Sequence, residues 1–280
     1  MIEIAICLAI IGIALVSIIG VLPMGLNVQK DNREETIINQ DATVFMEYIR
    51  NGASSPYGSD LTNYVYAITN SQTRYNNPGV TTVVPTPGWG NNTYLTNNAR
   101  IIGLLSTPEY IAADGTPLNN LFSGGYSNYV VAYVRSISGP ASEKPPQDNN
   151  IIRGDAFSYK IVCENVPVAM AFSLWQAQSY GAGSQVFYNS FYWQATATTS
   201  SGDIPGASAL WKQVVYPQQL AANLHELRLT FLWPLLPNGK TGNGRQTFRT
   251  AVAGQIVTNI DAGQILYFFQ PQSFTNISAP

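Results

Sequence analysis

The chain has 280 residues, a formal net charge of −2 and a charged fraction of only 11%. Soluble domains usually carry about 25% charged residues, so uncharged polar side chains must solvate much of this surface. The sequence contains no basic face, which excludes an ordinary nucleic-acid-binding domain, and we expect no nucleic-acid partner. The length is sufficient to bury a full-sized core in one or two domains.

The first segment of the chain is strongly apolar. Residues 4–22 contain no charged side chain, and a single acid, Glu3, precedes them. As a helix, this run would span about 28 Å, which is close to the thickness of a bilayer's hydrocarbon core. No Lys or Arg precedes Lys30 and no small-residue cleavage site follows the run, so a cleaved secretory signal fits poorly. Two alternatives remain: an ordinary membrane anchor, or a helix that leaves the membrane to pack in the core of a filament.

The helical pattern continues beyond the apolar run but becomes amphipathic. Ile38, Ala42, Phe45 and Ile49 recur at helical spacing and predict a stripe that packs on the following domain. We expect the charged side chains of this segment to face solvent or neighbouring subunits; they are Lys30, Asp31, Arg33, Glu34, Glu35, Asp41 and Glu47. Asn51 and Gly52 form a helix stop signal, so residues 1–51 are predicted to be one long helix, with residues 1–25 as its membrane or filament-core half.

A short segment with helix-breaking residues separates the two halves of the predicted helix. Pro23 lacks a backbone N–H and clashes with the preceding turn, while Gly20 and Gly25 add flexibility. We therefore expect the helix to be interrupted between residues 20 and 25. The interruption would be either a kink in a membrane helix or a stretch that unwinds in an assembled filament.

Residues 52–280 read as a globular head rich in β-strands. We expect a helical turn at 108–113, a turn at 236–239, and an antiparallel pair formed by the strands at 157–164 and 166–174. The last strand would close the sheet. The predicted strands are 64–69, 80–84, 100–106, 129–138, 157–164, 166–174, 186–198, 224–235, 247–257 and 265–269. The predicted fold class is α+β: a long N-terminal helix followed by a mainly antiparallel β-sheet head domain.

The N-terminus carries a family resemblance. The segment Met1-Ile2-Glu3-Ile4-Ala5-Ile6-Cys7-Leu8-Ala9-Ile10-Ile11-Gly12-Ile13 resembles the start of type IV pilins and type II secretion pseudopilins. The glutamate, the aliphatic run after it and the Ala-Ile-Ile-Gly segment carry the resemblance. In that family the glutamate lies two residues further from the mature N-terminus. Either two residues precede this sequence, which we favour, or the chain departs from the pattern.

The resemblance implies a function as well as a fold. It implies cleavage by a prepilin peptidase, methylation of the mature N-terminus (Met1, if the mature chain begins there), storage in the bacterial inner membrane, and extraction by an assembly machinery. It also implies a homopolymer of identical subunits on the cell surface, in which Glu3 pairs with the N-terminal ammonium of a neighbour, with Gly20, Pro23 and Gly25 as further assembly positions. The alternatives are a periplasmic pseudopilin and a membrane-anchored surface binding domain. In each filament reading the protein is not an enzyme.

Other candidate sites have simpler explanations. His225 stands beside Glu226, but neighbouring strand residues point to opposite faces, so a structural role for the histidine is favoured. Cys7 and Cys163 belong to different environments and are not expected to pair. No catalytic or cofactor-binding motif appears; calcium is the one cofactor considered, with loop aspartates Asp114, Asp148, Asp155 and Asp203 as candidates without EF-hand spacing. Asn91 and Asn276 stand in N-glycosylation sequons, and surface loops could carry glycans.

Overall fold

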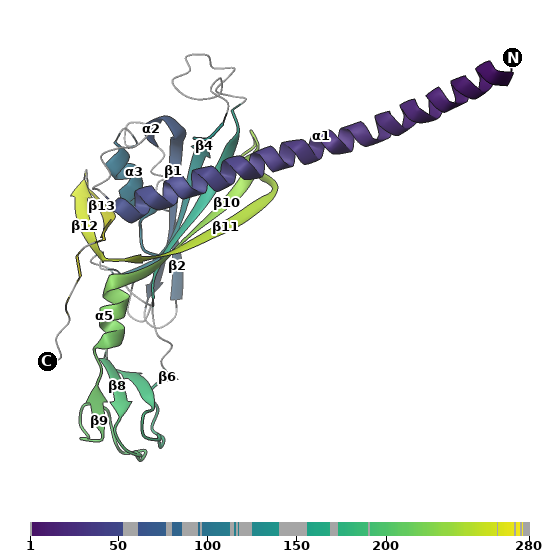
Figure 1. The fold of residues 1–280 in the computed structure, drawn as a ribbon. Coiled ribbons are helices and arrows are strands. Elements are labelled where there is room, and N and C mark those ends of the chain that lie inside the picture. The colour runs from purple at the N-terminus through teal and green to yellow at the C-terminus, as the bar shows by residue number, and fades with distance from the viewer. Residues whose placement is uncertain are drawn as a thin grey trace.

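The structure is a computed structural model of the chain. It describes residues 2–52, 61–76, 80–85, 95, 97–112, 115, 117, 125–139, 156–168, 173–189, 191–261, 263–271, 273, 274 and 276. A long helix leads into a β-rich head, which confirms the predicted α+β class (Figure 1).

Helix α1 runs without a break from Ile2 to Asn51 and contains Pro23 in its interior. The expected interruption between residues 20 and 25 is therefore wrong for the single chain. A proline removes one backbone hydrogen bond and costs about 3 kcal/mol in a helix interior. Long stretches of regular helix flank it on both sides, and propagation from them keeps the turn helical.

The main sheet has seven strands in the described part of the chain, in the order β11-β10-β5-β4-β1-β2, with β3 paired to β4. All of its pairings are antiparallel. Its strands are β1 (Val65–Asn76), β2 (Val80–Pro85), β3 (Tyr110–Ile111), β4 (Tyr126–Arg135), β5 (Ser158–Pro167), β10 (Leu224–Leu235) and β11 (Thr241–Ala253). The turn between β10 and β11 covers the predicted residues 236–239.

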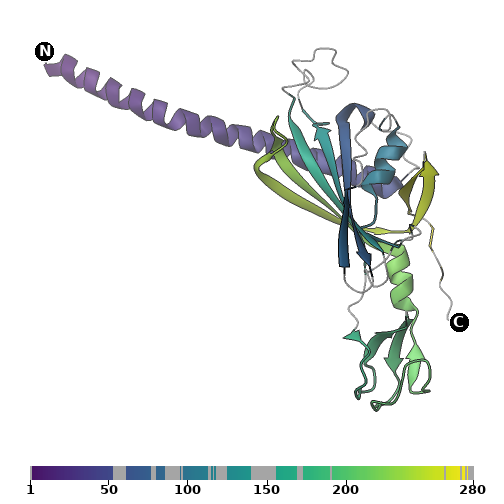
Figure 2. The same ribbon diagram turned by 180° about the vertical axis from the view of Figure 1, so that it is seen from behind.

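Two smaller sheets lie beside the main one. Strands β12 (Gln255–Asp261) and β13 (Gln264–Gln270) pair with each other. A second small sheet contains β6 (Ser173–Leu174), β7 (Gln185–Tyr188), β8 (Phe191–Ala195) and β9 (Trp211–Gln213). Helix α5 (Tyr216–Asn223) leads from this sheet back to β10, and the sheet projects away from α1 in both views (Figures 1 and 2). The remaining helices are α2 (Leu61–Tyr64) and α3 (Asn98–Leu105).

The C-terminal part of α1 covers one face of the main sheet. Ile38, Ala42, Phe45 and Ile49 are fully buried in the core, which confirms the predicted stripe. They pack in one cluster with apolar residues of β1, β4, β5, β10 and β13. The helix ends where predicted: Gly52 has φ +58, and a side chain there would collide with the carbonyl of Phe269. Glycine meets both requirements because it lacks a Cβ atom.

Several predicted elements differ from the observed ones. Residues 100–106 form most of helix α3 rather than a strand, because Asn97 caps it by accepting a hydrogen bond from Ala99 N at 2.8 Å. Part of the predicted helical turn at 108–113 is strand β3. Residues 157–164 and 166–174 do not pair with each other: β5 continues to Pro167 and lies between β4 and β10. The last strand pairs with β12 and does not close the main sheet.

Candidate assembly surface

The N-terminal half of α1 projects from the head as a free apolar rod (Figure 1). It is long and apolar enough to cross a membrane, and no part of its most apolar window is buried. Sixteen large apolar side chains on it are exposed by 53–78%: Ile2, Ile4, Ile6, Leu8, Ile10, Ile11, Ile13, Leu15, Val16, Ile18, Ile19, Val21, Leu22, Met24, Leu26 and Val28. Soluble monomers rarely expose apolar patches beyond a few hundred Å², so this surface requires a membrane or a protein partner.

The apolar rod does not pack against the head of its own chain. The first buried residue along α1 is Glu34, and the continuous apolar packing on the sheet starts at Ile37. Apart from the neighbouring residues and backbone of α1 itself, nothing in the described chain lies within 4 Å of the position where a Cβ atom would stand on Gly20 or Gly25. Two of the predicted assembly positions therefore lie on an open helix surface.

Glu3 lies in the first turn of α1, exposed and far from the head. Within the part of the chain that the structure describes, Glu3 makes no ion pair with another residue. A carboxylate in the first turn interacts favourably with the helix dipole, which is a local role open to Glu3 without any partner. Met1 lies outside the described residues.

Asp41 does not face solvent or a neighbouring subunit as predicted but is completely buried under the sheet. Its carboxylate accepts hydrogen bonds from Ile137 N at 2.9 Å, Ser138 N at 2.7 Å and Tyr159 Oη at 2.7 Å. Burial raises the pKa of the Asp41 carboxyl, and hydrogen bonds from the side chains of Ser138 and Tyr159 and from the backbone N–H groups of Ile137 and Ser138 oppose that rise. Burial raises the pKa of Tyr159, and the charge of Asp41 and the hydrogen bond to it raise it further. This group of contacts fixes the position of α1 against the end of β4 and the start of β5.

Glu34 departs from the prediction in the same way, because it is also buried. Its partner is Lys30, whose Nζ lies 3.7 Å from Glu34 Oε1. Burial raises the pKa of the Glu34 carboxyl, and Lys30 opposes the rise. A helical charge pattern does not distinguish such residues from solvated ones, since only the position of the sheet decides which face is covered.

His225 has the structural role that its sequence context favoured. It is buried, with Nδ1 3.0 Å from Asn165 Oδ1. Asn165 donates from Nδ2 to the carbonyl of Ser106 at 2.6 Å, so its Oδ1 is the acceptor and His225 Nδ1 carries the proton. The network joins β10, β5 and the segment after α3. Burial lowers the pKa of His225 from 6.5 to about 4.

We expect His225 to destabilise the head under acid conditions. Its pKa is lower in the folded state, so the unfolded chain binds the proton first and stability is lost as pH falls from 6.5 towards 4. The loss reaches about 2 kcal/mol at pH 5. The pKa of Asp41 is raised in the folded state, so protonation of Asp41 stabilises the head as pH falls and opposes the effect of His225. Urea unfolding of the full chain in non-ionic detergent, compared with His225→Gln at pH 7 and pH 5, isolates the histidine; equal pH dependence in both proteins would contradict this assignment.

The loop aspartates and the glycosylation sequons are the remaining candidates. In the described ranges no three His, Cys, Asp or Glu side chains are grouped to hold a metal ion. Asp203 is half-buried and accepts hydrogen bonds from Ser200 and Ser208, which lower the pKa of its carboxyl. Asp114, Asp148, Asp155 and the sequon at Asn91 lie outside the described residues, and Asn276 is exposed.

The cysteines are separate, as expected. Cys7 is exposed on the apolar rod, whereas Cys163 is buried in β5. Burial raises the pKa of the Cys163 thiol, so it packs as a small apolar side chain.

A scan against protein-family models and searches of curated proteins and of solved structures found no match to this chain.

Proposed function

We propose that the chain is the structural subunit of a type IV pilus-like helical filament, held in the membrane by α1 before assembly and packed through α1 afterwards. The observation that carries this proposal is the exposed apolar rod on a folded head. The N-terminal segment resembles those of pilins through Glu3 and the aliphatic run after it, and this resemblance is the reason for proposing a type IV pilus-like filament rather than another assembly.

Burial of the rod, in a bilayer or among other copies, is strongly favoured over its exposure to water. Fully burying one large apolar side chain is worth about 1.5–3 kcal/mol. The sixteen exposed side chains could therefore contribute on the order of 20 kcal/mol or more, which exceeds the association cost of about 4–15 kcal/mol. A bilayer satisfies the same surface, so membrane storage and filament packing are alternative environments for one helix. A helix that serves in both environments must not be covered by its own head, which agrees with the exposed rod.

The remaining parts of the proposal follow from the pilin resemblance. A prepilin peptidase would release and methylate the N-terminus, an assembly machinery would extract the subunit from the inner membrane, and the filament would extend from the cell surface. Glu3 would pair with the N-terminal ammonium of a neighbouring copy. The head has no role in catalysis in this proposal.

The test is electron microscopy of filaments sheared from the producing cells, with the chain identified by mass spectrometry. We expect long filaments in which this chain is the major component. Its presence only in short structures within the envelope would favour the pseudopilin alternative. Recovery as a dispersed membrane protein under all conditions would contradict a filament role and favour an anchored binding domain.

A further inference from the structure

The closed end of the β10–β11 hairpin has an unusual combination of exposed groups. We define the hairpin tip as residues 236–240. Leu236 N donates to the carbonyl of Lys240 at 2.8 Å, and Gly239 N donates to the carbonyl of Leu236 at 2.9 Å, so the tip is an ordered turn. Leu236 is 42% exposed, and Lys240 is exposed beside it. An apolar side chain and a cation thus stand together at the end of a rigid hairpin.

The hairpin tip points along α1 towards the apolar rod in both views (Figures 1 and 2). Gln246 on β11 donates to Asn39 of α1 at 3.1 Å, which fixes the level of the strand on the helix. From Gln246 to Lys240 the strand advances about 20 Å, the length of about 13 helical residues. The tip therefore reaches approximately the level of Leu26 to Lys30, where the apolar rod ends.

The hairpin is basic in this region. Residues 229–260 contain Lys240, Arg245 and Arg249 but no Asp or Glu. Lys160 on β5 adds a fourth charge, because its Nζ donates to the carbonyl of Gly239 at 2.6 Å.

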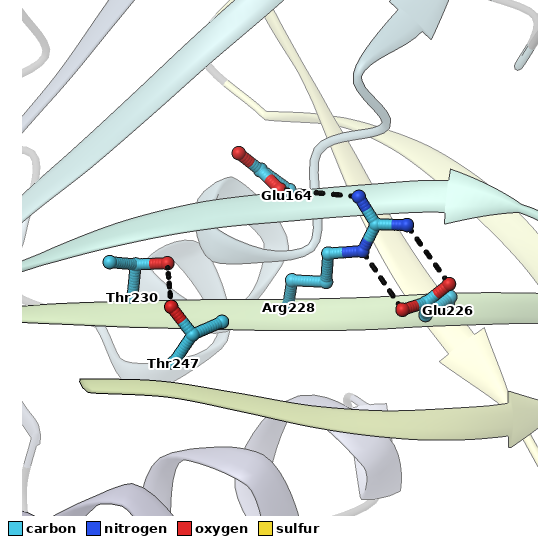
Figure 3. Close-up of polar contacts among 5 residues, drawn as sticks. All are labelled: Glu164, Glu226, Arg228, Thr230 and Thr247. Atoms are coloured by element: carbon cyan, nitrogen blue, oxygen red, sulfur yellow. Dashed lines mark hydrogen bonds and ion pairs between the residues drawn. The ribbon is translucent and has the colours of Figure 1, made fainter.

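Among the described residues, two carboxylates on β5 and β10, Glu164 and Glu226, are paired with Arg228. Arg228 binds Glu226 through two hydrogen bonds of 2.9 and 3.0 Å, and its Nη1 lies 3.8 Å from Glu164 (Figure 3). At the level of the tip, α1 itself carries both signs: Lys30 and Arg33 against Asp31, Glu34 and Glu35. Among the described residues at the end of the apolar rod, the hairpin therefore carries basic side chains without acidic ones.

We propose that the hairpin tip is a second membrane contact, which docks on anionic phospholipid headgroups while the apolar half of α1 is in the bilayer. Leu236 enters the interface, and Lys240 and Lys160 meet the lipid phosphates. Charge complementarity supports this occupant, since each basic side chain near an anionic leaflet adds to binding within a Debye length. The inference rests on the membrane-held form of the proposed function. Its consequence is a head with a fixed orientation on the membrane before assembly.

The experiment places a polarity-sensitive fluorophore on the full chain in vesicles of 30% phosphatidylglycerol and 70% phosphatidylcholine, with a headgroup nitroxide lipid as quencher. The label is attached at Pro237→Cys in a Cys7→Ser background, which keeps Leu236 and Lys240, while the buried Cys163 remains unlabelled. The matched position is Thr258→Cys, which is exposed on β12 near the opposite end of the head. We expect at least threefold stronger quenching at position 237 than at position 258.

Charge variants test the lipid chemistry. Lys240→Glu should reduce quenching at position 237 by at least half, and pure phosphatidylcholine vesicles should have the same effect. Arg249→Glu makes the same charge change further from the tip and should reduce quenching less. Quenching that is unchanged by Lys240→Glu, or equal at positions 237 and 258, would overturn the inference. A signal that follows protein density in the vesicles rather than lipid charge would indicate a second copy as the occupant and would also overturn it.

A label on the native Cys7, in the otherwise unchanged chain, tests insertion of α1 into the membrane separately from the hairpin contact. A hydrocarbon-like signal from Cys7 with no contact at position 237 would refute the hairpin contact alone. No insertion at Cys7 would refute both the membrane-held form and the hairpin contact.

Discussion

Replacing Glu3 by alanine is expected to leave the chain in the membrane but to reduce filament yield by at least about tenfold, which corresponds to about 1.4 kcal/mol in the assembly equilibrium. Apolar contacts along residues 4–22 attract neighbouring copies but define no unique register, because one aliphatic ridge resembles the next. A carboxylate within such packing is costly unless it is paired, and the N-terminal ammonium of a neighbour would pair with it only at one axial position. The charge pair would therefore set the axial register between copies, whereas apolar packing only brings the copies together.

The controls for this prediction separate charge from local helix stability. Glu3→Gln keeps the shape of the side chain and removes its charge, so it should also fail to assemble. Glu35→Ala removes an exposed carboxylate further along the same helix and should assemble normally. The measurement is the amount of this chain in sheared filaments relative to the membrane fraction. Filaments of normal length and abundance from Glu3→Ala would show that Glu3 only stabilises its own helix end.

Asp41→Ala should lower the free energy of unfolding of the head by about 3–5 kcal/mol, a large part of the 5–15 kcal/mol typical of a domain. The substitution leaves three donors, Ile137 N, Ser138 N and Tyr159 Oη, without their acceptor under α1. A buried group without its hydrogen-bond partner costs about 1–3 kcal/mol. Urea unfolding of the full chain in non-ionic detergent measures the change.

Two matched variants accompany Asp41→Ala. Tyr159→Phe removes only one of the hydrogen bonds to Asp41 and should cost about 1 kcal/mol. Asp31→Ala removes an exposed carboxylate from the same helix and should change stability by less than about 0.5 kcal/mol. If Asp41→Ala were as stable as Asp31→Ala, the carboxylate would not be what fixes α1 against the sheet.

The sequence predicts those features that periodicity alone determines. The helix from the apolar run to Asn51, the buried stripe of Ile38, Phe45 and Ile49, and the hairpin around residues 236–239 all follow from local spacing and turn residues. These signals are local, so no knowledge of the tertiary arrangement is needed to detect them.

The features that the sequence did not predict depend on tertiary packing. Residues 101–105 are apolar throughout, which does not distinguish a buried strand from a buried helix; Gly103 allows α3 to lie against Leu266 and Phe268 of β13. The role of Asp41 follows from donors nearly a hundred residues or more away in the chain. Of the candidate site, the apolar rod is predictable, but the level of the hairpin tip on α1 requires the structure.

The most direct test of the central claim is a helical reconstruction of assembled filaments by electron cryo-microscopy. The claim is that the apolar half of α1 is buried among copies of the same helix. We expect the large apolar side chains of residues 4–22, which are more than half exposed in the single chain, to become less than about one tenth exposed through contacts with neighbouring α1 helices. A filament in which this helix faces solvent, or folds back on its own head, would contradict the account.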